Sequence, residues 1–177
     1  KIGKGAKLDH GFVALGGGQA SCLSHISIEQ ESLSQYSLTS IQHGWELSRL
    51  EPRIIQLNKQ GATTLKGLQI TSGSQQIATH SVVRFDGPEG SLKQLQKAAA
   101  SEQSHSIFDG TVEVPQIAQK TNAEQLSRNL LLSKNARIDT KPELEIVADD
   151  VKCTHGATVS HLQEEELFYL RSRGISS

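Results

Sequence analysis

Short segments in which apolar and polar residues alternate recur along most of this 177-residue chain, and they restrict its fold more than any other feature. They are separated by Gly, Ser or Asn, and examples are Ile55–Leu57, Leu68–Ile70, Ile77–Thr79 and Val83–Phe85. Strict alternation is typical of half-buried strands, whose side chains point to the two faces in turn. The pattern therefore predicts an all-β protein, and it leaves a sandwich, a barrel and a β-solenoid open.

The composition favours the solenoid among these three folds. The chain contains one Trp, two Tyr and four Phe, whereas Ser and Gln together account for 37 residues. A core built around aromatic rings is therefore not expected, and small and aliphatic residues stacked in layers suit this composition better. In a solenoid each coil buries its face only against the neighbouring coils. No repeat of fixed length is visible in the sequence.

Two segments depart from the alternation and predict helices. Ser91–Ala100 is a block of Ala, Leu, Lys and Gln that follows the turn signal Gly87–Gly90, so it predicts a helical excursion on the surface. Gln163–Arg173 has acidic residues first and basic residues last, and it predicts a C-terminal helix that stops at Gly174.

One further segment, Thr121–Leu132, fits two structures. Thr121 and Glu124 have the spacing of a capping box, which would open a helix. The same residues also alternate as a strand would, and Asn129 is a poor residue for a helix interior. A strand is the preferred interpretation.

The segment Asp149–Ser160 holds the candidate metal ligands, Cys153 and His155. They are two positions apart, so a strand would place both side chains on one face. A thiolate and an imidazole can bind zinc, copper or iron, although two ligands alone do not make a site. Cys153 fits equally well as a small hydrophobic residue packed between coils. Asp149 and Asp150 are better explained as turn and interface residues than as an acid/base pair.

The order of residues from Phe108 to Ile175 is similar to that of a known family. The segments that carry the similarity are Phe108–Val114, Ala118–Gln125, Asn129–Ser133, Asp139–Ile146, Asp149–Thr158 and Leu167–Ile175. In this order they resemble the C-terminal half of the SufB/SufD family of iron–sulfur cluster assembly proteins. The resemblance covers roughly residues 105–176, and residues 1–104 fit by general pattern only.

This resemblance implies a fold and a domain organisation. The family fold is a right-handed parallel β-helix flanked by helical pieces. Residues 1–162 would form the β-helix core, and residues 163–177 would begin a C-terminal helical region. The chain lacks an initial Met and stops before the further helices of the family, so we expect it to be a piece of a longer protein.

The resemblance also implies a function. SufB members carry cysteines in this half and a Glu after the matching histidine, whereas here Gly156 follows His155 and Cys22 is the only other thiol. That is the pattern of the SufD branch: a non-catalytic subunit of the SufBCD complex that pairs with SufB through the C-terminal edge of the β-helix and engages the SufC ATPase. His155, with Cys153 beside it, would lie at the SufB interface, where a transient iron ion or iron–sulfur cluster is shared. No cofactor would be bound by the chain alone, and the isolated protein could form a homodimer.

Several other functions fit the sequence less well. Net charge is −1 with both signs scattered, which argues against nucleic-acid binding. No apolar run is long enough to cross a membrane. With no secretory signal, we expect the protein to lie in the cytoplasm, or in the plastid stroma of a plant or alga.

Gly16–Gly18 lacks the Lys and Ser/Thr of a phosphate loop and predicts a turn. The rival hypotheses are a β-helix enzyme acting on carbohydrate, for which no carboxylate cluster is evident, and a self-assembling structural solenoid.

Overall fold

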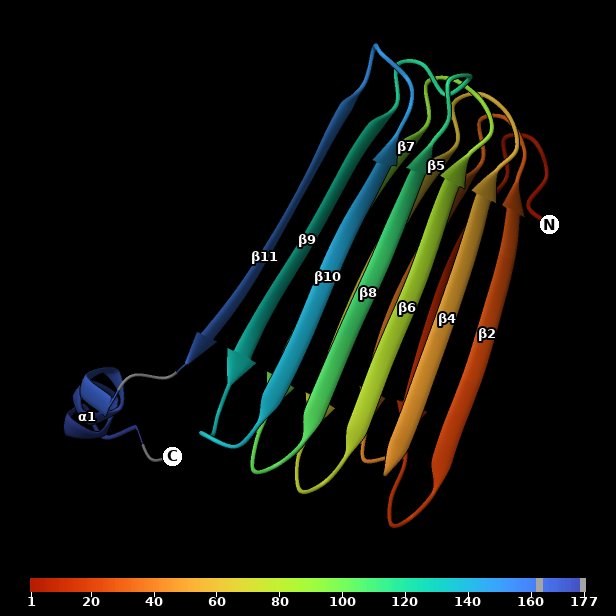
Figure 1. Cartoon of the computed structure of the whole chain (residues 1–177). Coiled ribbons are helices and arrows are strands. Elements are labelled where there is room, and N and C mark those ends of the chain that lie inside the picture. Colours follow the sequence, from red (N-terminus) through yellow and green to blue (C-terminus); the bar gives the residue numbers. More distant parts are fainter. Residues whose placement is uncertain (162–163, 176–177) are drawn as a thin grey trace.

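The computed structural model describes residues 1–161 and 164–175, and this part of the chain alternates its strands between two parallel sheets (Figure 1). The odd-numbered sheet contains, in spatial order, β1 (Lys7–Leu15), β3 (Gln35–His43), β5 (Ala62–Thr71), β7 (Ser91–Ala100), β9 (Asn122–Leu131) and β11 (Lys152–His161). The even-numbered sheet contains β10 (Arg137–Ile146), β8 (His105–Val114), β6 (Gln76–Phe85), β4 (Leu47–Gln56) and β2 (Ser21–Gln30).

Each strand from β1 to β9 pairs in parallel with the strand two further along the chain, so the chain winds through one sheet and then the other. One turn of this winding is a coil, made of one strand from each sheet. Such pairing requires a crossover between paired strands, and here the crossover is itself a strand of the opposite sheet. The prediction of a parallel β-solenoid is therefore confirmed.

The coils differ in length, which explains why no fixed repeat is visible in the sequence. Gln35 pairs with Ala62, 27 positions later, whereas Ser91 pairs with Asn122, 31 positions later. The difference lies in the turns, because the strands themselves are nine or ten residues long. A turn of variable length hides the period without disturbing the register of the strands.

The prediction of a helix at Ser91–Ala100 is wrong, because this segment is the central strand β7. Leu92, Gln94 and Ala98 face the interior, and Lys93 and Lys97 face outward. The segment pairs along its whole length with β5 on one side and β9 on the other. The helix propensity of Ala, Lys and Gln amounts to only tenths of a kcal/mol per residue, so two ladders and a buried face outweigh it.

The other two segments agree with expectation. The ambiguous segment forms β9, as preferred. The C-terminal helix α1 spans Glu164–Ser172; the predicted start at Gln163, like the domain boundary at Leu162, lies outside the described residues. Gly174 ends the helix in the left-handed region, and its amide donates to the Arg171 carbonyl at 3.0 Å. No helix in the described part of the chain is long and apolar enough to span a membrane.

The solenoid interior is apolar towards one row of turns and polar in its middle. Residues such as Tyr36, Ile54 and Phe85 form the apolar cluster. Beyond it lie buried glutamines, serines and threonines that bond to one another across the two sheets. The Thr79 hydroxyl, for example, accepts from Gln42 at 2.8 Å and from Gln69 at 3.0 Å. The large number of Ser and Gln residues in the composition thus supplies the core as well as the surface.

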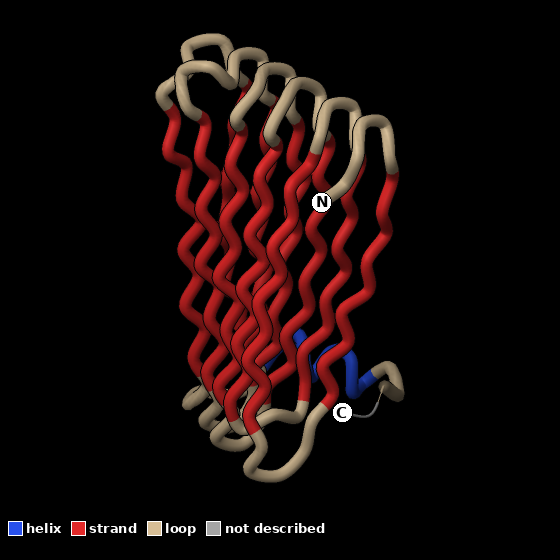
Figure 2. The backbone as a smooth tube through the Cα atoms, turned by 90° about the vertical axis from the view of Figure 1, so that its right-hand side faces the viewer, coloured by secondary structure: helices blue, strands red, loops and turns tan. Residues whose placement is uncertain are grey.

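One row of turns repeats the same backbone geometry from coil to coil (Figure 2). Each turn holds one residue at positive φ, and these residues are Gly5, Leu33, Gln60, Glu89 and Lys120. Each donates its amide to a carbonyl of the next turn, as Leu33 does to Lys59 at 3.2 Å. Four of the five carry a side chain in a conformation that favours glycine.

We expect Thr79→Val to lower the free energy of unfolding by about 1–3 kcal/mol, because the buried side-chain amide of Gln42 would lose the acceptor that it has among the described residues. Urea titration measures this change. Thr39→Val is the matched control, since Thr39 lies on the exposed face of β3 and should change stability by less than about 0.5 kcal/mol. Equal effects of the two variants would contradict the structural role of the interior hydroxyl.

We expect Leu33→Gly to raise the free energy of unfolding by up to about 1 kcal/mol. A left-handed residue with a side chain costs roughly 1–2 kcal/mol, and glycine loses about 0.5–1 kcal/mol through chain entropy. Leu23→Gly is the control, because Leu23 is also exposed but lies within strand β2, where glycine should destabilise. Thermal unfolding distinguishes the two signs, and destabilisation by both variants would refute the argument.

Candidate functional site

The candidate ligands Cys153 and His155 lie on β11, at the edge of the odd-numbered sheet. Cys153 pairs in register with Ala123, and His155 pairs with Gln125. Ala123 and Gln125 are buried and face the interior. Residues paired in register in a parallel sheet point to the same face, so Cys153 and His155 share the interior face, as the spacing of two predicts.

His155 is exposed although it lies on this inward face. Among the described residues, no strand pairs with the outer edge of β11 or of β10, and so no coil covers this layer. The His155 side chain forms no hydrogen bond or ion pair with another described residue. Its imidazole is accessible to a ligand or to another chain.

Cys153 lies two residues before His155 on β11 and is more enclosed. It is half-buried, and it packs against the apolar cluster that includes Leu92 and Ala123. Burial raises the pKa of the Cys153 thiol, and a hydrogen bond with the Ala123 backbone offsets part of this rise. The thiol is therefore protonated at neutral pH and is a weaker metal ligand than a free thiolate.

The final coil, made of β10 and β11, also carries apolar side chains that are only partly covered. Val159 on β11 and Ile146 on β10 expose about two-fifths of their surface, and Ile138 and Leu144 are half-buried. The outer edges of both strands also present main-chain amides and carbonyls that another strand could bind. The final coil thus combines two side-chain donors with a surface suited to protein contact.

The described residues do not form a complete metal site. No three His, Cys, Asp or Glu side chains in the described part of the chain come together as a group that could hold a metal ion. His161 was not selected from the sequence, but its pairing with Leu131 places it on the same face as His155, at the far end of β11. The alternation of the strand is the signal that could have identified it. Cys153 and His155 can supply at most part of a ligand set, and the remainder would have to come from elsewhere.

The neighbouring acidic residues Asp149 and Asp150 belong to a turn, as expected. The Asp149 carboxylate accepts from Gln116 Nε2 at 3.0 Å. The Asp150 amide donates to Gln119 Oε1 at 2.9 Å, and its carbonyl accepts from Lys120 at 2.6 Å. These contacts hold consecutive turns together.

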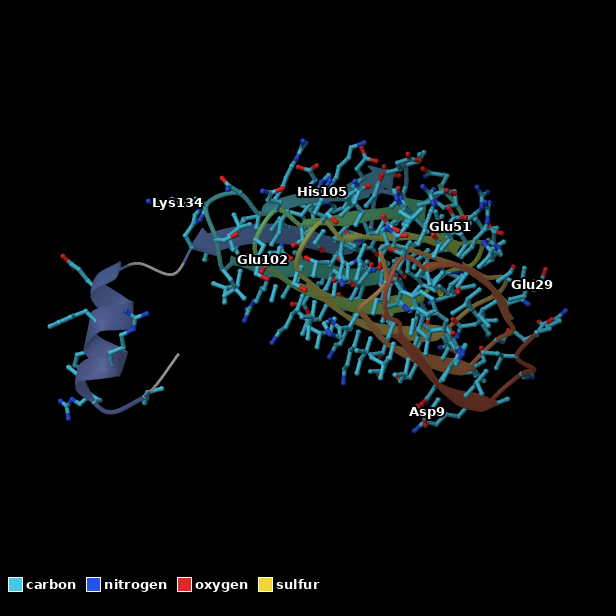
Figure 3. The ribbon with its side chains drawn as sticks, turned by 90° about the horizontal axis from the view of Figure 1, so that it is seen from below. Asp9, Glu29, Glu51, Glu102, His105 and Lys134 are labelled. Atoms are coloured by element: carbon cyan, nitrogen blue, oxygen red, sulfur yellow. The ribbon has the colours of Figure 1, made fainter. Side chains whose placement is uncertain are left out.

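Other histidines contact acidic residues on the outer face of the even-numbered sheet, where Figure 3 labels Glu51 and His105. His25 lies 3.7 Å from Glu51, His80 lies 3.8 Å from Asp109, and His105 lies 2.8 Å from Asp139. Burial raises the pKa of the Asp139 carboxyl. Hydrogen bonds from Arg137 and His105 together lower it by more, so the pKa lies below its usual value. These side-chain contacts lie on the outer face of the solenoid and not on the inward face that carries Cys153 and His155.

Gly16–Gly18 lies in the turn between β1 and β2, in agreement with the sequence. A Cβ atom at Gly16 would lie 2.2 Å from the Trp45 ring, so the first glycine is needed for packing. Packing against Trp45 therefore explains the first glycine of the run, and no phosphate ligand is needed to explain it.

Comparison with known proteins identifies the family. The family described as "SUF system FeS cluster assembly, SufBD core domain" matches residues 1–177. An iron–sulfur cluster assembly SufBD family protein of Synechocystis is 42% identical over 99% of this chain and 39% of its own length. The chloroplastic protein ABCI7 of Arabidopsis thaliana is 38% identical over 98% of this chain and 37% of its own length.

The iron–sulfur cluster assembly protein SufD of Escherichia coli is 36% identical over 87% of this chain and 37% of its own length. The chain therefore spans less than two-fifths of the length of these relatives. A family match along the whole chain, together with the parallel solenoid, shows that this chain belongs to the SufB/SufD family of the SUF iron–sulfur cluster assembly system.

Proposed function

We propose that this chain is the core of a SufD-type, non-catalytic subunit of the SufBCD complex, which assembles iron–sulfur clusters. The observation that carries the proposal is the final coil, where His155 is exposed beside Cys153 on a face that no described strand covers. Membership of the family supports iron–sulfur cluster assembly as the process, and the geometry of this coil supports its location on the chain.

The partner at this coil is SufB. The exposed apolar side chains of Val159 and Ile146 would be buried by the contact, and the free edges of β10 and β11 would pair with strands of SufB. At about 25 cal/mol per Å² of apolar surface, such burial contributes to association without any metal. Metal chemistry is therefore a separate property of the same interface.

Iron, or the nascent cluster, is the cargo of this interface. The His155 imidazole would provide one nitrogen donor, and SufB would provide the thiolates that a cluster prefers. Cys153 lies two residues from His155 on the same face and could bind the same ion, but its enclosed thiol makes it the weaker metal ligand. The chain would then contribute part of a ligand set that neither subunit completes alone.

ATP hydrolysis would come from SufC and not from this chain. The one glycine run forms a turn that packs against Trp45 and lacks the Lys of a phosphate loop. Closure of SufC would change the contact between the two β-helices and so the access of iron to His155. The chloroplastic relative from Arabidopsis and the bacterial relatives are consistent with the stroma or the cytoplasm as the compartment.

We expect His155→Ala in the full-length protein to lower the iron content of the co-expressed SufBCD complex by about tenfold or more. Loss of an outer-shell partner already costs roughly 10–100-fold in metal affinity, and loss of a direct ligand should cost at least as much. Thermal stability and recovery of SufB should change little, because the ring is exposed. Iron analysis of the purified complex and differential scanning calorimetry measure the two effects.

His161→Ala is the matched control for this variant, because His161 lies on the same strand and the same face and is also exposed. It should leave the iron content unchanged. Normal iron loading in His155→Ala would refute the proposed role. Loss of SufB from the complex would show instead that His155 is a contact residue, and a homodimer without SufB would favour the self-assembling solenoid.

We expect Cys153→Ser to lower the iron content less than His155→Ala does, because the protonated, half-buried thiol is the poorer donor at neutral pH. The same variant should lose some thermal stability, since a hydroxyl would replace a sulfur packed on the apolar cluster. Iron analysis and calorimetry on the same preparations compare the two variants. A larger iron loss in Cys153→Ser than in His155→Ala would reverse the assignment of the stronger ligand.

A further inference from the structure

A buried glutamine, Gln125, lies directly beneath His155 in the stack of coils. Gln125 has no exposed surface, and its in-register partner on the next strand is His155. Its Nε2 donates to Gln94 Oε1 at 2.9 Å and to the Gly110 carbonyl at 3.1 Å. The side chain is therefore held from the preceding coil and from the opposite sheet at once.

These two contacts fix which end of the amide is nitrogen. The Gly110 carbonyl can only accept, so the group that faces it must be the donor. Gln94 uses its own Nε2 to donate to Ser81 Oγ at 2.8 Å, which leaves its oxygen free to accept from Gln125. A Cβ atom at position 110 would lie 2.4 Å from Gln125 Nε2, so a side chain there would displace this amide.

The oxygen of the same amide, Gln125 Oε1, is buried and has no hydrogen-bond partner among the described residues. A buried acceptor without a partner costs roughly 1–3 kcal/mol, and such atoms are rare in folded proteins. With the nitrogen turned towards Gln94 and Gly110, the oxygen is left for the next coil.

The next coil offers one side-chain donor at this level. Pro142 pairs with Gly110 on the even-numbered sheet, and it carries no N–H group. His155 pairs with Gln125 on the odd-numbered sheet, and a neutral imidazole always carries one N–H group. His155 is thus the residue of that layer whose side chain can donate to Gln125 Oε1.

We propose that Gln125 is a positioning residue for His155. In this structure the imidazole forms no hydrogen bond with a described residue; rotation of the exposed ring would let one nitrogen donate to Gln125 Oε1 and so present the other nitrogen to the cargo metal. An acceptor on one ring nitrogen fixes the tautomer and the ring orientation of a metal-binding histidine. The metal part of this inference rests on the proposed function. The hydrogen bond itself does not, because it satisfies a buried atom with or without iron.

The test uses the full-length protein with ring-¹⁵N histidine, in which His155→Ala identifies the His155 signals. In the wild-type protein we expect one dominant tautomer and a slowly exchanging ring N–H. Gln125→Met removes the acceptor at similar volume, so the ring should revert to the tautomer mixture of free imidazole. Iron in the co-expressed SufBCD complex should fall by about 10–100-fold, as for loss of an outer-shell partner.

Gln69→Met is the matched control, because Gln69 is an equally buried glutamine that bonds Thr79, Ser106 and the Ile107 carbonyl. It should destabilise the protein but leave the His155 ring signals and the iron content unchanged.

Unchanged ring signals in Gln125→Met would overturn the proposal. If Gln125→Met does not fold, a His155 ring N–H in the wild-type protein that exchanges as fast as that of His161 overturns it instead. A normal iron content in His155→Ala would refute the metal-binding role of His155. The ring signals would then still test the hydrogen bond on its own.

Discussion

In-register parallel pairing between consecutive coils determines the rest of this structure. Each ladder places a residue directly above its counterpart one coil earlier, as with Gln94, Gln125 and His155. A side chain is therefore surrounded by residues about 30 positions away in the sequence and seldom by its chain neighbours. Buried bonds such as that between Gln125 and Gln94 exist only because the register is kept from coil to coil.

The polar interior follows from this constraint. A buried amide in a stacked column has another coil above and below it, and so it can bond along the column and across to the other sheet. Gln69, for instance, bonds Thr79, the Ile107 carbonyl and Ser106. Each such group is stable only when its neighbours satisfy it, because a buried polar atom without a partner is costly. The interior therefore fixes one register, where an apolar core of uniform residues would tolerate a slip.

The same logic gives the final coil its chemical character. Its inward residues continue the columns of the core, yet no described coil covers them, so core-type positions become surface positions. Cys153 still touches the apolar cluster and behaves as a core residue with a raised pKa. His155, next along the same face, is exposed. A surface of this kind presents the partly exposed apolar side chains of Val159 and Ile146 together with an accessible imidazole.

The sequence by itself determined the strands, the shared face of Cys153 and His155, and the family, because alternation and a contiguous motif are local properties. It did not determine that Ser91–Ala100 is a strand, since every inward position there is Leu, Gln or Ala and the segment reads as helix-forming. Nor did it show that His155 is exposed while Cys153 is half-buried, or that Gln125 lies beneath His155. Those facts depend on which coil stacks on which, and turns of unequal length hide that register from any reading along the chain.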